Sequence, residues 1–479
     1  MNPKSKQSMV VILYVCVLGF LGSGCASTKN LSKAWEAGDI KGSVAEASRK
    51  AENKTLGSAK DVVVWRLNEG AARRAAGEYE QSNKALDLAE EEIDKFEEKA
   101  KVKVSQEAIG IISNLEMLDY EGHAYDKIMM NTYKAVNYLQ AGDFEKAGHE
   151  FKRALERQRD AVEINARRIE MAEEEAQKQK EKAEKDKKGQ ADLEQINKDE
   201  KFQSGLNSNY AELDTYKAYA NYENPFTVYL DGLFFLCQGT GGSDWERSRK
   251  SFERTLGMVG DNKFIQQDMA TIEHLLAGQP QPPTTYVIFE TGEAPDRTQI
   301  RIDLPLFVVG RPVGQKVPYM GAAFPKLRFH NDQIPQLSVS AGDVTESTAL
   351  VASMDSIVAQ DFKNELPMVV TRTLVGSAGK AAITYGLGEA GGDAGKYLKI
   401  IGVLYNAIMN QADKRAWVTL PKEFQVCRLP TPADRKIKLA APNSAQETEV
   451  TVDEGTINVV WVKSINQNTP LIVSQFKLK

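Results

Sequence analysis

Apolar residues follow three successive patterns along the chain, and each predicts a different structure. A nearly unbroken apolar run covers residues 9–21. From there to residue 278, apolar and small residues recur at the spacing of amphipathic helices. After residue 283, short runs alternate apolar with polar residues, as at Glu449-Val450-Thr451-Val452, which is typical of strands with one covered face. The patterns predict a helical first half and a β-rich second half.

The helical half contains internal repeats. Residues 131–155 read NTYKAVNYLQAGDFEKAGHEFKRAL, with small and bulky residues at Ala135, Tyr138, Gly142, Phe144, Ala147, Phe151 and Ala154. This stretch resembles the tetratricopeptide repeat, in which two antiparallel helices interlock through small residues packed against aromatics, with a glycine at the turn. The resemblance implies an α-solenoid over residues 31–278, with a concave surface that binds protein partners.

Weaker copies of the same pattern extend the array. Their turn glycines are predicted at Gly38, at Gly77 and within residues 239–242, so the spacing starts near the family's period of about 34 residues and then lengthens. Insertions therefore separate the later units. The other residues that define these copies are Trp35, Ile40, Ala47, Trp65, Gly70, Tyr79, Leu86, Ala89, Gly232, Phe235, Trp245, Phe252 and Leu256.

One insertion is visible by composition. Residues 157–188 are almost uninterrupted helix formers, with practically no apolar residue after Met171. A helix running on from Phe144 would extend about 65 Å at 1.5 Å per residue. We predict a long charged helical insertion near 157–205, whose distal part has no face to bury. A solvated helical tip is the favoured interpretation, and a coiled-coil partner site is the alternative.

A Pro-rich linker, residues 279–283, ends the helical pattern because proline interrupts helices and restrains the residue before it. We place a domain boundary there and expect a β-rich domain over 284–479. A β-sandwich is the natural arrangement for its strands. The predicted strands cover residues 285–290, 299–309, 326–330, 336–341, 416–420, 423–429, 435–440, 447–452, 456–463 and 470–478.

A helical insert interrupts these strands near 353–414 and is rich in small residues. We expect two or three helices, with Pro367 starting one of them and a glycine-rich break after Tyr385. Small residues permit close packing, which favours a helical hairpin against the sheet or a neighbour. Contact with a bilayer is the alternative.

The first residues have the parts of a secretory signal. Lys4 and Lys6 precede the apolar run, which is too short to span roughly 30 Å of hydrocarbon as a stable helix. Leu21-Gly22-Ser23-Gly24-Cys25 resembles the lipobox of bacterial lipoproteins. The resemblance implies that residues 1–24 are a signal peptide and that Cys25 is acylated, which attaches the chain firmly when several acyl chains are present. An ordinary signal with an incidental cysteine is the alternative.

The residues after Cys25 help to predict which membrane would hold the protein. Ala26 follows, without the aspartate that in many such proteins means retention in the inner membrane. The resemblance therefore implies an outer-membrane anchor facing the periplasm. A lipidated tether, residues 25–30, would reach at most roughly 17 Å, so the folded part begins close to the bilayer.

Charge and cysteine content narrow the function classes. The chain has 61 basic and 66 acidic residues, and removing Lys4 and Lys6 with the signal changes the balance from −5 to 59 minus 66, or −7. A mildly acidic chain offers no broad attraction to nucleic acid. Cys237 and Cys427 have apolar sequence neighbours, which favours buried thiols over a disulfide.

No motif predicts catalysis. Gly386, Gly388 and Gly391 have the spacing of a dinucleotide-binding motif. Dinucleotide binding requires a strand before these glycines, whereas a helix is expected there. Gly395-Lys396 lacks the other residues of a phosphate loop. His123, His149, His274 and His330 have no ligand partner at metal spacing, so we interpret all four histidines as surface or structural. We expect no enzyme, cofactor or metal, and Cys25 is the one predicted site.

Residues 415–423 (RAWVTLPKE) with Arg428-Leu429-Pro430 resemble the late segment of a group of uncharacterised bacterial outer-membrane lipoproteins that join repeat helices to a β-rich tail. The resemblance implies a periplasm-facing scaffold or adaptor for an unidentified envelope protein partner, with support of cell-envelope assembly as one version. A lipid- or glycan-binding lipoprotein that uses the C-terminal domain is the alternative.

Overall fold

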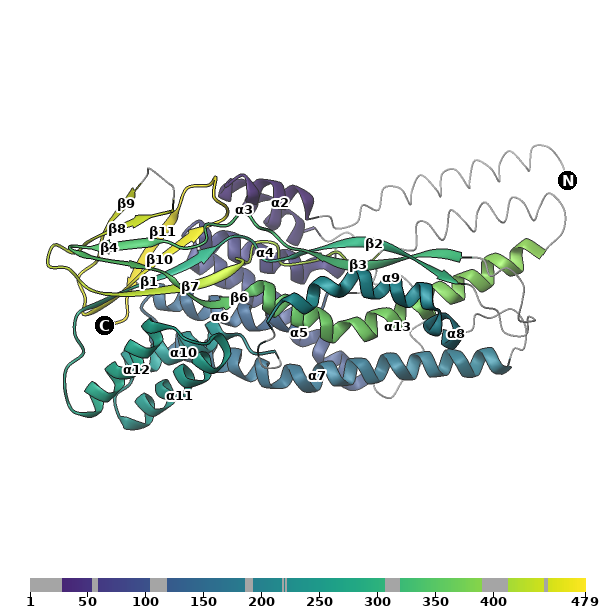
Figure 1. Cartoon of the computed structure of the whole chain (residues 1–479), viewed down its shortest axis with the longest axis horizontal. Helices are drawn as coiled ribbons and strands as arrows, with labels where there is room; N and C mark the ends of the chain where they lie inside the picture. Colours follow the sequence, from purple (N-terminus) through teal and green to yellow (C-terminus); the bar gives the residue numbers. More distant parts are fainter. Residues whose placement is uncertain are drawn as a thin grey trace.

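The computed structural model describes residues 28–53, 59–103, 119–185, 193–217, 219, 222–305, 319–389, 412–442 and 447–479. The described chain is a mixed α and β protein, with most helices in its first part and the sheets in its second part (Figure 1). The predicted signal peptide and Cys25 lie outside the described residues, as do Gly391 and Gly395-Lys396.

Consecutive helices pack in pairs in the first part of the chain, joined by short turns. Three predicted turn glycines, Gly38, Gly77 and Gly142, have φ angles of 73°, 78° and 73°, a region that glycine enters without strain. They confirm the predicted turns. The pairs are α2 (Lys29–Glu36) with α3 (Ile40–Ala51), α4 (Val62–Ala75) with α5 (Tyr79–Lys103), α6 (Ala124–Gln140) with α7 (Phe144–Lys185), and α10 (Pro225–Gln238) with α11 (Gly242–Val259). Helix α12 (Lys263–Leu276) packs against α11.

The same packing detail recurs in two helix pairs. A Cβ on Gly70 would meet the Leu86 side chain at 2.4 Å, and a Cβ on Gly232 would meet the Phe252 ring at 2.8 Å. Close approach also lets a hydroxyl of the second helix donate to the glycine carbonyl, since Ser82 Oγ lies 2.7 Å from the oxygen of Gly70. The α10–α11 pair has an equivalent serine bond of 2.7 Å. The small residues of the sequence repeat therefore mark helix contacts.

Helix α7 continues without a break for 42 residues, about 63 Å at 1.5 Å per residue, which confirms the helix predicted from Phe144. Figure 1 shows α7, α9 (Glu200–Tyr210), α13 (Met354–Glu389) and the β2–β3 ribbon extending together away from the sheets. We call this part the arm. Helix α13 packs along α7, so the helix that carries the charged insertion has a neighbour over part of its length. The remaining short helices are α8 (Leu193–Lys198), η1 (Ala59–Asp61) and η3 (Ala211–Thr215).

The strands within the described residues form three sheets. A five-stranded sheet has the order β11-β10-β1-β7-β6, with β1 parallel to β10 and antiparallel to β7. Its strands are β1 (Thr284–Thr291), β6 (Ala349–Ser353), β7 (Glu423–Pro430), β10 (Ile457–Ser464) and β11 (Ile472–Lys477). A four-stranded sheet, β5-β4-β8-β9, contains β4 (Ser338–Ala341), β5 (Val344–Ser347), β8 (Lys436–Ala440) and β9 (Glu447–Thr451), and the ribbon pairs β2 (Asp296–Pro305) with β3 (Tyr319–Arg328).

One hydrophobic cluster contains residues from both sides of the Pro-rich linker. Phe226 of α10 stacks on Phe424 of β7 with ring centroids 3.9 Å apart, and Tyr133 of α6 meets Trp417 edge-on at 5.9 Å. Every residue of β1 is buried, which means that both faces of this strand are covered. The linker separates helices from strands along the sequence, while both pack on a shared core.

Helix α2 contacts the sheet through a small separate cluster. Trp35 is fully buried against Ala72 of α4 and Ile465, which follows β10. The side chain of Asn466 also donates to the carbonyl of Glu36, at the end of α2, over 2.8 Å. The first described helix is therefore fastened to the β10–β11 loop.

Two expectations for the second part of the chain are wrong. Residues 416–420 form a turn instead of a strand, because contacts with α4 replace strand pairing: Asn68 Nδ2 lies 3.4 Å from the oxygen of Ala416, and Thr419 donates to Asn68 Oδ1 over 3.3 Å. Pro367 lies inside α13 and starts no helix, and α13 continues past Tyr385 to Glu389. Strands β5 and β6 were not predicted.

Within the described residues, no helix combines the length and the hydropathy required to cross a bilayer. Cys237 and Cys427 are both free and buried, which confirms the prediction of buried thiols over a disulfide.

Candidate functional sites

The structure brings together two groups of one histidine and two carboxylates. His123, Asp361 and Glu365 form the first group, and Glu293, His330 and Asp332 form the second. In each group, atoms able to bind a metal all lie within 4.8 Å of one another. Sequence spacing could not reveal the first group, because His123 and Glu365 are 242 residues apart.

The start of α6 holds His123 in place. The backbone N–H of His123 donates to Asp126 over 2.9 Å, and the hydroxyl of Tyr120 donates to the same carboxylate over 2.5 Å. The imidazole stacks on Tyr125 with ring centroids 5.3 Å apart. Gly122, with φ of 76°, turns the chain into this position. The ring is therefore fixed by the helix cap and by aromatic contacts.

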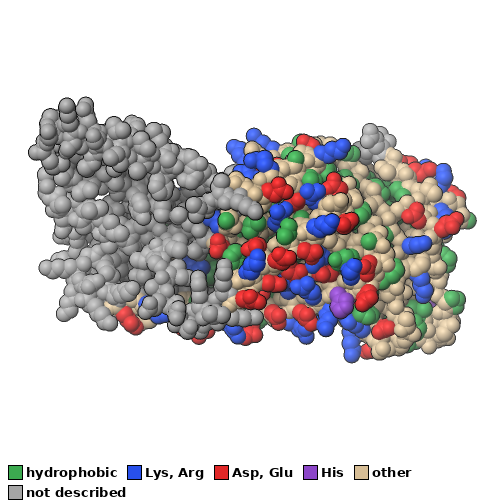
Figure 2. Space-filling view, turned by 180° about the vertical axis from the view of Figure 1, so that it is seen from behind, with side chains coloured by type: hydrophobic (Ala, Val, Ile, Leu, Met, Phe, Trp, Pro, Cys, Tyr) green, Lys and Arg blue, Asp and Glu red, His purple; other side chains and the backbone are tan. Residues whose placement is uncertain are grey.

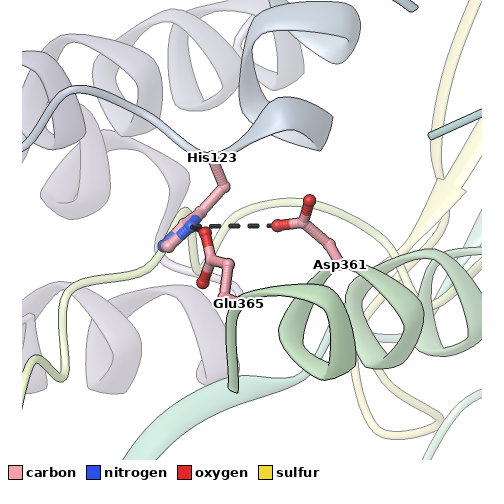
Figure 3. Close-up of side chains that lie close together, drawn as sticks. All are labelled: His123, Asp361 and Glu365. Carbon is pink, nitrogen blue, oxygen red and sulfur yellow. Dashed lines mark hydrogen bonds and ion pairs between the residues drawn. The ribbon is translucent and has the colours of Figure 1, made fainter. Parts of the chain in front are cut away.

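Helix α13 supplies both carboxylates of the first group. Asp361 and Glu365 are four residues apart, so they share one face of the helix. His123 Nδ1 lies 2.8 Å from Glu365 Oε1 and 3.8 Å from Asp361 Oδ2 (Figure 3). Arg297 of β2 completes the group: its Nη2 donates to Glu365 Oε2 over 2.9 Å and lies 3.3 Å from His123 Nδ1.

Burial and neighbouring charges shift the pKa values of the two carboxylates in opposite directions. Burial, followed by the charge of Glu365, raises the pKa of Asp361 to about 7. Burial also opposes ionisation of Glu365, but interactions with His123 and Arg297 hold its pKa well below the ordinary value. Glu365 is therefore ionised while Asp361 retains a proton into the neutral range, and Arg297 balances the charge.

The first group does not fit a metal ion, because the Arg297 guanidinium already donates a hydrogen bond to Glu365 and lies close to His123 Nδ1. A cavity of about 50 Å³ borders Asp361 and Glu365. This volume holds water but is far below the roughly 300 Å³ of a small-molecule site. The group acts as a charge-balanced junction that joins α6 to two elements of the arm, α13 and β2.

The second group lies beside the five-stranded sheet and has a different character. Glu293 follows β1, while His330 and Asp332 follow β3. Glu293 is 3% exposed, yet within the described residues none of the three side chains makes a hydrogen bond or an ion pair. Burial, followed by the charges of Glu36 and Asp332, raises the pKa of Glu293 to about 8.

Other buried charges hold the helices on the sheet. Glu290 of β1 accepts hydrogen bonds from Lys463 over 2.6 Å and from the Trp461 indole over 2.9 Å. Arg74 of α4 lies over the Trp461 ring at 4.4 Å, and the Tyr133 hydroxyl lies 3.3 Å from Glu290. This network connects α4 and α6 with β1 and β10, so its role is structural.

The remaining sequence candidates give no catalytic arrangement. Burial raises the pKa of both described thiols, Cys237 and Cys427, to about 12, so neither is a nucleophilic thiolate near neutral pH. Gly386 and Gly388 lie within α13 and do not follow a strand. His149 and His274 are exposed on α7 and α12, which agrees with surface histidines.

The described fold and sites define a mixed α and β protein with a charge-balanced junction and a second, unpaired histidine–carboxylate group. Comparison of the sequence and structure with protein-family models, with curated proteins and with solved structures gives no match.

Proposed function

We propose that the protein is a lipid-anchored scaffold or adaptor of the bacterial outer membrane, facing the periplasm and binding an envelope protein partner through helical repeats. In this proposal the paired helices are tetratricopeptide-like, the β-rich part is sandwich-like, and assembly of the cell envelope is one process that the protein supports. The lipobox-like sequence ending at Cys25 is the observation that carries the proposal.

The anchor hypothesis agrees with the start of the described chain. Helix α2 begins at Lys29, four residues after Cys25, so only a short segment would separate an acylated cysteine from folded structure. Changing Cys25 to Ala should release the protein from the membrane fraction of intact cells. Membrane fractionation unchanged by C25A would contradict the anchor.

The structure directs the partner proposal to the outer helices. The first helix of each pair packs on the chain's own sheet: Gln140 of α6 bonds Ser474 of β11 over 3.0 Å, and Phe226 of α10 stacks on Phe424. The surface expected to be an open groove is therefore covered. We place partner binding on the second helices of the pairs, α5, α7 and α11, which carry the exposed ion pairs Lys84–Glu80, Arg167–Glu163 and Arg249–Glu246.

Charge supports a protein partner over nucleic acid. On the described part of the face in Figure 2, basic and acidic side chains are interspersed and form no large field of one sign. A mixed surface of this kind suits a protein with complementary pairs of charges, whereas nucleic acid requires a continuous basic patch.

Site-specific photo-crosslinking in intact cells tests this proposal. A photoreactive residue would replace Lys84 on α5, Lys152 on α7 or Arg249 on α11, with Lys436 on β8 as the matched exposed control. We expect the same partner adduct from at least two helical positions and none from the control. Absence of adducts at all three helical positions, or an identical adduct at Lys436, would contradict the proposal.

A hollow on the arm favours glycan binding as the second candidate function. An open volume of about 720 Å³ lies between α9 and β2, and most of the residues that line it are polar. Hydroxyl, amide and charged groups of this kind hydrogen-bond sugars, whereas a lipid chain requires an apolar lining. The lining residues are Lys201, Ser204, Gly205, Ser208, Asn209, Arg301, Ile302 and Asp303. Binding of peptidoglycan fragments that is abolished by Asn209→Ala would favour this candidate.

A further inference from the structure

We propose that Glu293, His330 and Asp332 bind one divalent transition-metal ion. The metal-binding atoms of the three side chains already lie within 4.8 Å of one another. Bonds from zinc to nitrogen and oxygen are about 2.0–2.2 Å long, so two ligands of one ion lie at most about 4.4 Å apart. Small side-chain rotations therefore suffice to bring all three onto one ion. This inference is independent of the proposed anchor and partner.

The backbone on either side of Glu293 is fixed. The N–H of Gly292 donates to Ser464 over 3.0 Å, and the N–H of Ala294 donates to Leu420 over 2.9 Å. Gly292 has φ of 71°, and a Cβ there would lie 2.7 Å from the Cβ of Gln333. Only glycine permits this approach, which brings the chain of Glu293 beside the loop that carries His330 and Asp332.

The other two residues are held through their backbones in the same way. Lys422 Nζ donates to the carbonyl of His330 over 2.7 Å, and the N–H of Gln467 donates to the carbonyl of Asp332 over 2.8 Å. Their side chains take no part in these bonds. The loop is therefore preorganised while its imidazole and carboxylate remain available, which is the arrangement that metal binding requires.

A cation is the partner that this group lacks. The buried Oδ1 atom of Asp332 has no hydrogen-bond partner in the described structure, and Glu293 is buried without an ion pair. Two basic side chains act on Glu293 or His330 electrostatically, but both are committed elsewhere: Lys463 bonds Glu290 over 2.6 Å, and Arg328 bonds Asp296 over 2.9 Å. Buried carboxylates without a counterion are costly unless they coordinate a metal.

The donor set indicates which ions fit. One imidazole with two carboxylates suits Zn²⁺, Mn²⁺ or Fe²⁺, whereas Mg²⁺ prefers oxygen ligands and retains several waters. His330 supplies one ring nitrogen, and Glu293 and Asp332 supply one carboxylate oxygen each. Glu36 at the end of α2 adds negative charge nearby. We therefore choose Zn²⁺ as the probe and Mg²⁺ as the control ion.

Calorimetric titration of the purified full-length protein, after treatment with a chelator, tests the proposal. We expect one Zn²⁺ per chain at neutral pH, a rise in Tm on adding Zn²⁺, and neither effect with Mg²⁺ at the same concentration. Glu293→Gln and His330→Asn should each weaken Zn²⁺ binding at least tenfold. Asp361→Asn, in the group balanced by Arg297, is the matched control and should leave Zn²⁺ binding unchanged.

A second measurement separates specific coordination from adventitious binding. Co²⁺ should produce visible absorption bands in the wild-type protein, and His330→Asn should shift or remove them because a nitrogen ligand is lost. Circular dichroism of both variants must match the wild type, so that a folding defect is not counted as support. Zn²⁺ binding that is absent from the wild type, or equal in the wild type and both variants, would overturn the proposal.

Discussion

The two histidine–carboxylate groups contain the same residue types in opposite electrostatic settings. In the group around His123, Arg297 is bonded to Glu365 over 2.9 Å, and the charges balance. In the group around Glu293, the nearby basic side chains pair with other carboxylates. Residue composition alone therefore does not decide whether such a group is a structural junction or a cation site. The decisive feature is whether a guanidinium or ammonium group is committed to it.

Removing Arg297 should give the largest effect. Arg297→Ala leaves Glu365 and its neighbours buried without their positive charge, and breaking a buried ion pair typically costs about 3–5 kcal/mol. Urea denaturation measures the loss in the free energy of unfolding. Arg301→Ala on the same strand is the matched control, because the Arg301 side chain is 77% exposed, and its effect should stay within about 0.5 kcal/mol. Equal effects of R297A and R301A would contradict a balanced junction.

Glu365→Gln should have a smaller effect of the same sign. The amide can still accept hydrogen bonds, but the charge that compensates buried Arg297 is lost, so we expect a destabilisation of about 2–3 kcal/mol. Thermal unfolding at neutral pH is the measurement. A stability equal to that of the wild type would mean that Glu365 contributes no charge to the junction.

Asp361 should make stability depend on pH. Its pKa is raised to about 7 in the folded protein. Because a carboxyl with a raised folded pKa binds its proton more tightly when folded, its contribution falls as pH rises from about 4 to about 7. Asp361→Asn removes this dependence. The variant should match the wild type near pH 4 and exceed it by roughly 1–2 kcal/mol above pH 7, measured by denaturation across this range. A constant difference between the two proteins would contradict the assignment.

Glu293→Gln should give the smallest effect, with the opposite sign to Glu365→Gln. In metal-free protein at neutral pH, the buried Glu293 carboxyl, whose pKa is about 8, keeps a proton that the unfolded chain has released. The amide of Gln needs no such proton, so we expect a stabilisation of about 1 kcal/mol. Differential scanning calorimetry in chelator compares the two Glu→Gln variants directly. A loss of stability in E293Q as large as that in E365Q would show that Glu293 has a stabilising partner.

Local features of the fold were predictable from the sequence. The glycines at 38, 77 and 142 mark turns because positive φ angles favour glycine, and the run from Phe144 continues as one helix because no proline interrupts it. Most strands were found through apolar runs or alternation. Tertiary contacts explain the wrong predictions. Residues 416–420 bond to α4 and do not pair as a strand. Pro367 lies inside α13, where Phe362 before it and Leu374 after it have buried side chains.

The candidate sites were much less predictable. Asp332 lies two residues after His330, whereas Glu293, Asp361 and Glu365 are far in sequence from the histidines that they meet. The packing of elements that are distant in sequence decides these meetings, and residue spacing carries no information about that packing. One local signal existed for the first group: the four-residue spacing of Asp361 and Glu365 places two acids on one helical face.

The fastening of α2 has a mechanical consequence. If Cys25 is held in a membrane, a force on the protein enters the chain at α2, where Trp35 is packed against Ile465 and Asn466 bonds the end of the helix. Load would then pass to strands β10 and β11 and, through the contact between Trp35 and Ala72, to α4. Under tension, one edge of the five-stranded sheet and the first helix pairs would share the force.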